Sequence, residues 1–398
     1  MSRPKANNAP LLALFLVLFV VSVGFGIIIP LLPIITREFG ASAFMLGAMT
    51  AGYAVLQFLF APLWGQLSDR IGRKPVLMIG ITGISLSFLF MGLAKSFWAL
   101  FAARVMGGFL GSATMPAAQA LAAELSSSSN RAKAMGLMGA AFGTGFIFGP
   151  LVGGVLSPLG ISAPMFAGAA FGFANVLLSA LALREPPPER KQLQGEARRS
   201  TFKYISLALR GPGAPFYHLA FVIMFCQSSL MTALALYLTD RFGVGTSTIG
   251  AIFALNGSIG ALVQGAAIGR ITERLGERGA IRAGLLLGVV AYAAIVLAPT
   301  LGLATGAIVL AALSMSLTRP AATSLLSQVT PLPQGVTMGV QGSFDSLGRV
   351  VGPLWAGFAY DQLQALPFLT AAAAYGLYLA VYMRRPQREP EPQPQSRA

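Results

Sequence analysis

Long runs of apolar residues, broken by short polar segments, recur along the whole chain. A helix must supply about 20 apolar residues to cross the roughly 30 Å hydrocarbon core of a membrane. Runs of that length predict twelve membrane spans, at residues 11–35, 44–66, 75–94, 98–124, 133–157, 164–183, 214–238, 246–269, 280–299, 303–327, 336–359 and 365–383. The pattern therefore predicts an all-α, multi-pass membrane protein.

One polar interruption is much longer than the others and is rich in proline and in charges of both signs. It covers residues 184–213 and is typical of a cytoplasmic linker. We expect it to separate an N-terminal six-helix bundle, residues 1–183, from a C-terminal six-helix bundle, residues 214–383. Residues 384–398 have the composition of a disordered cytoplasmic tail.

Short sequences of the first half recur in the second half at a nearly constant displacement. TREFG at residues 36–40 matches TDRFG at 239–243, displaced by 203, and GQLSDRIG at 65–72 matches GRITERLG at 269–276, displaced by 204. Such a repeat is hard to obtain by chance. It predicts two parallel bundles related by a pseudo-twofold axis along the membrane normal, with a cavity between them near mid-membrane.

The positions of the basic residues orient the spans. The chain is 55% hydrophobic and 10% charged, with a net charge of +15. If the N-terminus is cytoplasmic, 22 of the 28 Lys and Arg residues fall in cytoplasmic segments. The positive-inside rule then places both termini in the cytoplasm, with the chain in the cytoplasmic (inner) membrane. The basic charge reports topology and attraction to anionic membrane lipids, and not a nucleic-acid partner.

Several motifs carry a resemblance to a known family. GQLSDRIGRKP at residues 65–75 and RVMGGFLGSA at 104–113 resemble signature motifs of the major facilitator superfamily. The sequences GFGIIIPLLP, GTGFIFGPLVGG, TRPAAT and GSFDSLGRVVGPLWAG are similar to motifs of its twelve-span drug:proton antiporters, in particular bacterial quinolone, multidrug and tetracycline exporters. The resemblance implies the major facilitator fold and transport by alternating access.

The first of these motifs places Asp69 among basic residues, in a loop where Gly65 and Gly72 permit a tight turn. The resemblance implies that Asp69 also faces the start of the eleventh span, near residues 335–338, where the helix dipole favours an anion. We expect a conformational latch that holds the two halves in the outward-facing state, formed by Gly65, Asp69, Arg70, Gly72, Arg73 and Arg131. The alternative is a solvated loop that only enforces topology.

A Gly-Pro step occurs in the fifth span, at Gly149 and Pro150, and again in the eleventh, at Gly352 and Pro353. Proline removes one backbone hydrogen bond and permits a bend, so we expect these four residues to act as hinges. Close helix packing without motion is the alternative for the glycines. That the motif marks antiport is implied by the resemblance alone.

Three arginines lie within spans, where a central charge costs about 3 kcal/mol and therefore faces a cavity or a partner. Arg104 lies near the outer end of its span, from which its side chain could also snorkel to the surface. Arg319 and Asp345 both lie about 12–14 Å deep and could pair across adjacent helices. Arg349 lies on the same face as Asp345, one turn deeper.

Asp345 is the only one of the 13 acidic residues that lies well inside a span. A proton-coupled exporter needs a carboxylate whose protonation changes between the two faces of the membrane, and Asp345 is the candidate. The resemblance implies cavity acids on the first, seventh or tenth span, but those positions hold Val21, Met231 and Ser316. The alternative is that Asp345 only forms a structural ion pair with Arg349 or Arg319.

Other polar and aromatic residues within the spans are candidates for a substrate cavity. With the three arginines, they are Gln57, Gln119, Gln227, Asn256, Gln264, Gln341, Phe142 and Phe146. An apolar and aromatic wall with few polar groups suits lipophilic small molecules. For each residue singly, ordinary helix packing is the alternative.

The sequence contains no nucleotide-binding G-x-x-x-x-G-K-[ST], no zinc-ligand spacing and no catalytic triad. We therefore expect no cofactor, no metal and no enzyme activity. The leading hypothesis is a monomeric, proton-driven exporter of amphipathic drugs. The second is a facilitator or exporter of a small metabolite without proton coupling, in which Arg319 or Arg349 binds a substrate anion. The third is a membrane receptor or scaffold that transports nothing.

Overall fold

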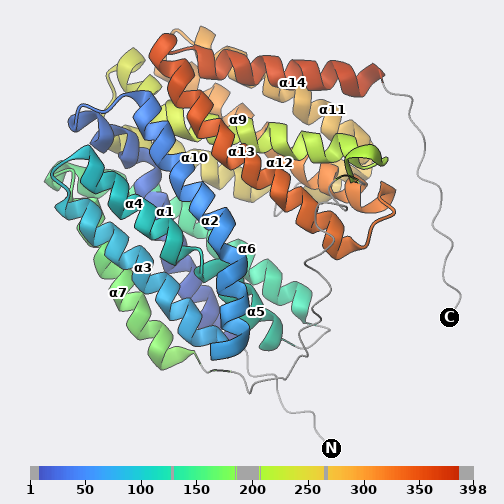
Figure 1. Ribbon diagram of the computed structural model, residues 1–398. Coiled ribbons are helices and arrows are strands. Elements are labelled where there is room, and N and C mark those ends of the chain that lie inside the picture. The colour runs from blue at the N-terminus through green and yellow to red at the C-terminus, as the bar shows by residue number, and fades with distance from the viewer. Residues whose placement is uncertain are drawn as a thin grey trace, which may run out of the picture. The chain divides into compact units, whose positions relative to one another are not determined.

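The computed structural model describes residues 9–126, 130–183, 185, 206, 208–263 and 268–384. Within these ranges the chain is helical and contains no strand, as Figure 1 shows. Residues 186–205 of the predicted linker and the predicted tail from residue 385 lie outside the described residues.

The described residues of the first half form seven α-helices and one short 3₁₀ helix, η1. They are α1 (Ala9–Glu38), α2 (Ala43–Ile71), α3 (Arg73–Leu93), α4 (Phe97–Gly111), α5 (Thr114–Glu124), α6 (Arg131–Leu156), η1 (Ser157–Leu159) and α7 (Ala163–Ala182).

In the second half, the described residues from 214 to 384 form six helices. They are α9 (Ala214–Phe242), α10 (Thr246–Leu262), α11 (Ile268–Leu297), α12 (Leu301–Val329), α13 (Gln334–Gln362) and α14 (Leu366–Arg384). Among the described residues, nine helices of the chain are long and apolar enough to cross a membrane, and α10 is a shorter apolar helix. The chain is thus a multi-pass membrane protein.

The predicted span at residues 98–124 is two helices, so the expectation of one continuous helix there is wrong. Helix α4 ends at Gly111 and α5 begins at Thr114. Pro116 cannot donate to the Ser112 carbonyl, and the preceding turns contain glycines 107, 108 and 111. The equivalent Pro320 lies inside the unbroken α12, where the matching positions hold Ala311, Ala312 and Met315. The proline breaks the helix only where glycines have weakened it.

A single residue separates α2 from α3. Helix α2 continues to Ile71, so the prediction that Gly65 lies in a turn is wrong. Gly72 alone makes the turn, with φ 104°, and its amide donates to the Ser68 carbonyl at 3.1 Å. Gly276, the equivalent residue of the second half, kinks α11 with φ 67°. Both positions need the left-handed conformation that glycine adopts at low cost.

The chain divides into two compact units, and the first of them contains residues from both halves. The first comprises Met1–Gln192, Ser228–Ala261 and Arg349–Pro367, and the second comprises Leu193–Gln227, Leu262–Gly348 and Phe368–Ala398. Helices α9 and α13 therefore contribute one end to each unit.

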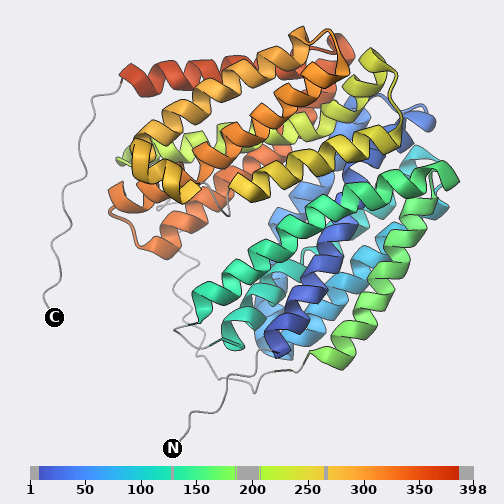
Figure 2. The same ribbon diagram turned by 180° about the vertical axis from the view of Figure 1, so that it is seen from behind.

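Close helix contacts form the core of the first unit. Helix α1 lies against α6 and α7, and α3 lies against α4 and α7 (Figure 2). Small residues allow these approaches, as is typical of helices in membranes. A Cβ on Gly111, for example, would lie 2.8 Å from Ile84. The buried Asn175 on α7 donates to the Val17 carbonyl of α1 at 2.9 Å.

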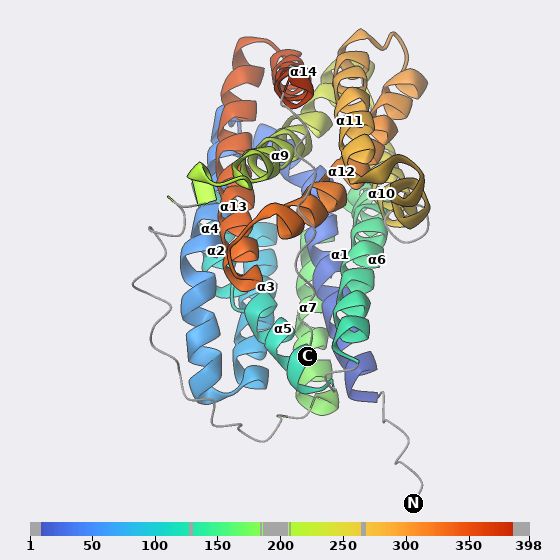
Figure 3. The same ribbon diagram turned by 90° about the vertical axis from the view of Figure 1, so that its right-hand side faces the viewer.

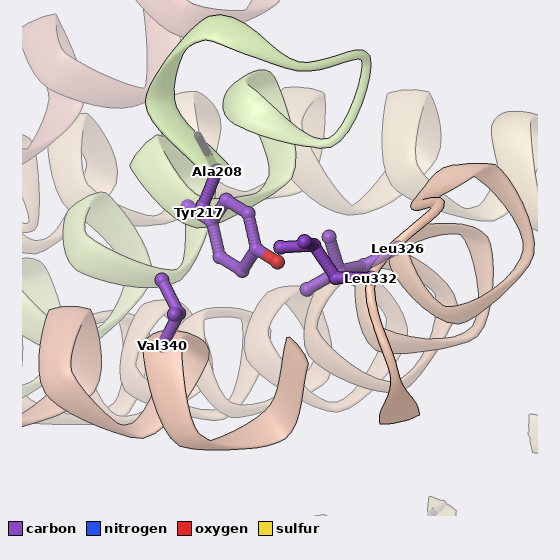
Figure 4. Packing of buried hydrophobic residues seen from close by; sticks show 5 residues of the cluster. All are labelled: Ala208, Tyr217, Leu326, Leu332 and Val340. Carbon is purple, nitrogen blue, oxygen red and sulfur yellow. The ribbon is translucent and has the colours of Figure 1, made fainter. Parts of the chain in front are cut away.

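The second unit is built on the pair of helices α11 and α12, which lie side by side in Figure 3. Buried Ser314 of α12 donates to the Gly284 carbonyl of α11 at 2.6 Å. An apolar cluster joins the start of α9 to α12 and α13 and contains Ala208, Tyr217, Leu326, Leu332 and Val340 (Figure 4). The ring of Phe344 on α13 stacks on Tyr217, with centroids 5.9 Å apart. This packing fixes the helix that carries Asp345.

Candidate functional site

Two polar contacts, one helical turn apart, join α12 to α13. Arg319 Nη2 donates to Asp345 Oδ2 at 2.9 Å, and Gln341 Nε2 donates to Thr323 Oγ1 at 2.7 Å. Each helix contributes residues four positions apart, so both contacts fall on one face of each helix. We call Arg319, Thr323, Gln341 and Asp345 the α12–α13 ladder.

The two charges of the ladder differ in their exposure to solvent. The side chain of Asp345 is 12% exposed, whereas that of Arg319 is 37% exposed. Three residues after Asp345, at Gly348, α13 approaches the backbone of α9 so closely that a Cβ would lie 2.8 Å from the Phe225 nitrogen. The carboxylate is thus buried, and a half-exposed guanidinium balances its charge.

Gln341 adds an unused polar atom to the ladder. The residue is 7% exposed, and its Oε1 is buried without a hydrogen-bond partner among the residues that the structure describes. A buried acceptor of this kind is costly unless a donor reaches it in some state of the protein. The ladder therefore offers a hydrogen-bond acceptor beside its ion pair.

Arg349 lies one turn beyond Asp345 on α13 and is exposed. The tenth-span position where the resemblance implies an acid holds Ser316, which is 2% exposed on α12. The corresponding first-span residue, Val21, is 5% exposed. Both are buried side chains that cannot ionise.

Arg104 lies on α4 with its guanidinium carbon 4.0 Å from the ring centroid of Tyr53 on α2. Arg104 is 9% exposed, so protein atoms cover its side chain. The ring face attracts the cation, most strongly where water is excluded. The structure thus gives Arg104 an aromatic partner on the neighbouring helix.

Two residues of the predicted latch, Asp69 and Arg73, pair at the junction of α2 and α3. Arg73 forms an ion pair with Asp69 and another with Glu124 at 3.0 Å, and its Nη1 donates to Ser68 Oγ at 2.8 Å. Arg70 is exposed, and the side chain of Arg131 lies outside the described residues. Asp69 therefore has Arg73 as its described ionic partner.

Glu185, for which the sequence indicates no role, completes this junction. Its carboxylate accepts from the Arg73 and Lys74 amides at 2.6 and 2.7 Å, which are the first two amides of α3. The helix dipole favours an anion there. A Cβ on Gly72 would lie 2.6 Å from the same carboxylate, so the absence of a side chain at Gly72 leaves room for Glu185 to cap α3.

Both Gly-Pro steps lie inside continuous helices, Gly149-Pro150 in α6 and Gly352-Pro353 in α13. A Cβ on Gly149 would lie 2.5 Å from the Gly26 Cα of α1. The Gly352 carbonyl accepts a hydrogen bond from Ser229 Oγ of α9 at 3.0 Å. Each step is therefore held in close contact with another helix.

The remaining candidates for a cavity differ in their surroundings. Gln57, Gln227, Asn256 and Phe142 are partly exposed, and Gln119 and Phe146 are exposed. The Oδ1 of Asn256 is buried and lacks a partner in the described part of the chain. Gln264 lies outside the described residues. Gln227 and Gln341 belong to the second unit and the others described to the first.

Metal binding finds no support in the described ranges. No three or more His, Cys, Asp or Glu side chains there are grouped so that they could hold a metal ion.

Comparison with known proteins identifies relatives along almost the whole chain. The chain is 33% identical to multidrug resistance protein 1 of Bacillus subtilis, over 96% of this chain and 98% of that protein. It is 34% identical to the class E tetracycline resistance protein of Escherichia coli, over 89% and 88% of the two chains. The quinolone resistance protein NorA of Staphylococcus aureus is 27% identical over 89% of this chain and 90% of its own.

Solved structures show the same fold. A bacterial homologue of the human lysosomal transporter Spinster, in an inward-facing and unoccupied conformation, matches with a TM-score of 0.76 and 22% identity, over 96% of this chain and 94% of that one. The nucleoside transporter NupG matches with a TM-score of 0.75 and 14% identity, over 94% and 98%. The Major Facilitator Superfamily model matches residues 14–353 and 219–398. The chain belongs to the major facilitator superfamily of membrane transporters, among relatives that confer multidrug and tetracycline resistance.

Proposed function

We propose that the protein exports amphipathic drugs, with cationic or zwitterionic character, in exchange for protons by alternating access of its two halves. The observation that carries the proposal is the similarity, over nearly the full length, to a multidrug resistance protein and to tetracycline resistance proteins. Similarity over nearly the full length of both chains supports a shared transport cycle.

Asp345 is the residue to which we assign proton coupling. It is the one acidic residue that the described structure buries, and its partner Arg319 comes from a different helix. Protonation of Asp345 would remove the charge that holds Arg319 and would loosen α12 from α13. Release of the proton on the other side of the membrane would restore the pair.

The ion pair also bears on the class of substrate. Asp345 already neutralises Arg319, so binding of a substrate anion by Arg319 would require this pair to break. A cationic drug can instead compete with Arg319 for the carboxylate, and the unused Gln341 Oε1 would accept a hydrogen bond from a drug N–H group once the two helices loosen. These features favour a cationic substrate over an anionic metabolite.

We further propose that the protein lies in the cytoplasmic membrane as a monomer, with both termini in the cytoplasm. The distribution of Lys and Arg supports this orientation. Its partners are then the drug, protons and membrane lipids.

Proteoliposomes that contain a pH-sensitive dye test the proposed function. If the protein exchanges drug for protons, addition of a cationic fluorescent drug will move protons across the vesicle membrane. Drug flux without proton movement would support an uncoupled facilitator. The absence of both, from protein shown to be folded, would support a receptor or scaffold.

A further inference from the structure

We propose that Arg37, Asp240, Tyr360 and Asp361 form an outer lock, which holds one side of the transporter closed and opens once in each transport cycle. Outer here denotes the helix ends opposite the loops rich in Lys and Arg. The inference rests on the proposed alternating-access function. The residues concerned all belong to the first compact unit.

The centre of the outer lock is a two-armed ion pair between α1 and α9. Both terminal nitrogens of Arg37 donate to the Asp240 carboxylate, with Nη2 at 2.8 Å from Oδ2. The Tyr360 hydroxyl of α13 donates to the same oxygen at 2.6 Å, and Gln364 Nε2 donates at 3.2 Å. Asp240 thus receives donors from three segments, one from the first half and two from the second.

The neighbouring residue, Asp361, ties α13 to α2. Its two oxygens accept from the Ala43 and Phe44 amides, each at 2.9 Å. These are the first two amides of α2, and the N-cap residue Ser42 accepts from the third, at Met45, at 3.2 Å. An anion at this position satisfies the unpaired amides and the positive end of the helix dipole. Separation of α13 from α2 would return these amides to water.

A close backbone seam lies beside the outer lock. A Cβ on Gly47 of α2 would collide with the Pro353 carbonyl of α13, and a Cβ on Gly250 of α10 would collide with the Pro150 carbonyl of α6. The two contacts are equivalent in the repeat, because each residue has its counterpart 203 positions away. The outer ends of the two halves therefore meet with no intervening side chains at these points.

The strength of the outer lock suits a contact that must break. The Arg37 side chain is 47% exposed and that of Asp240 is 17% exposed, so water takes over their hydrogen bonds when they separate. An ion pair of this exposure shifts a two-state equilibrium by up to about fivefold. Several contacts of this strength can close the outer side and still allow it to open in each transport cycle.

Disulfide cross-linking measures closure directly. Ser157 Oγ of η1 and Thr246 Oγ1 of α10 are hydrogen-bonded to each other, and neither residue belongs to the outer lock. Cysteines at these two positions would therefore lie close enough to form a disulfide. The single native cysteine, Cys226, is buried and is removed by Cys226→Ser. The protein with Ser157→Cys and Thr246→Cys is then oxidised in vesicles without drug, and the rate of cross-linking is followed.

Asp240→Asn or Asp361→Asn should slow cross-linking by about fivefold. The charge exchange Arg37→Asp with Asp240→Arg should restore much of the rate, which a loss of folding would not allow. Glu38→Gln, an exposed neighbour of Arg37, is the matched control and should leave the rate unchanged. Variants are compared only if their gel-filtration profiles and melting temperatures match the parent.

Unchanged cross-linking in a variant that combines Asp240→Asn with Asp361→Asn would overturn the outer lock. Failure of the charge exchange to restore the rate would overturn the ion pair as its centre. The cross-linking assay contains no drug, so its result tests the outer lock even if the protein does not export drugs. The two proposals can therefore fail separately.

Discussion

Gly47 lies against the backbone carbonyl of Pro353, and this contact has a counterpart in Gly250 against Pro150. All four residues lie inside helices, and the atoms nearest to each glycine across the contact are backbone atoms. The Gly-Pro steps thus take part in helix–helix contacts as well as in helix geometry. A bend at either proline would separate its carbonyl from the facing glycine.

Gly47→Ala and Gly250→Ala should both disfavour the closed outer side. The added methyl group overpacks a tight contact, which typically costs about 1–3 kcal/mol. Cross-linking between cysteines at positions 157 and 246 should slow accordingly. Gly139→Ala is the matched control, since Gly139 lies in α6 with nothing within 4 Å of its Cβ position. Equal rates in all three variants would contradict a tight seam.

Asp345→Asn should abolish drug-driven proton movement and weaken the binding of a cationic drug, because the drug loses the carboxylate for which it competes with Arg319. Asparagine keeps the shape of aspartate but cannot carry the charge, so Arg319 loses its ionic partner. The measurement is the dye signal in proteoliposomes together with drug binding to the purified protein. Glu273→Gln, an exposed acid on α11, is the control and should retain coupling.

Arg319→Gln should destabilise the protein by a few kcal/mol at most, because it removes the Arg319 charge from the buried Asp345 carboxylate. Addition of Asp345→Asn to this variant should recover stability but not proton movement. Thermal unfolding in detergent checks the first statement and the vesicle assay the second. Proton movement that persists in the Asp345→Asn protein would remove Asp345 from the coupling role.

Tyr53→Phe should leave stability nearly unchanged, whereas Tyr53→Leu should lower it by about 2 kcal/mol. Phenylalanine keeps the ring face that Arg104 contacts at 4.0 Å. It removes a buried hydroxyl that has no hydrogen-bond partner among the described residues. Melting temperatures in detergent distinguish the two variants. Equal losses would show that the ring does not hold the arginine.

Gly72→Ala should destabilise the junction of α2 and α3 by about 1–3 kcal/mol. Alanine is strained at φ 104°, and its Cβ would meet the Glu185 carboxylate. Glu185→Gln should have a smaller effect of about 1 kcal/mol, because the amide oxygen can still accept from one backbone amide. Protease sensitivity of this junction and thermal unfolding measure both effects. A Gly72→Ala protein as stable as the parent would contradict the requirement for glycine.

The membrane spans could be predicted from the length of the apolar runs. The possible pairing of Arg319 with Asp345 could be predicted because both residues lie at a similar depth within their spans. The break between α4 and α5 could not, since Pro116 and Pro320 occupy equivalent positions and only one interrupts its helix. Whether the helix is interrupted depends on the preceding glycines. Each glycine lowers helix stability only slightly, and only their sum is enough to end the helix.

The acidic residues at helix ends were also missed. The sequence placed Asp240, Asp361 and Glu185 in loops, tails or helix ends, because position along the chain cannot tell a solvated acid from one that pairs with or caps a distant helix. One signal was present in the repeat. Arg37 and Asp240 occupy the same position of TREFG and TDRFG, 203 residues apart, and carry opposite charges.

The pairing of Arg37 with Asp240 has a consequence for how the two halves can have diverged. Residues that contact their own repeat equivalents lie near the pseudo-twofold axis, where a transporter assembled from two identical halves would bring two like charges together. In such an assembly the two like charges would repel each other at the position where Arg37 and Asp240 attract each other in this chain. The ion pair therefore required the halves to differ, and fusion into one chain allowed each copy to keep its own charge.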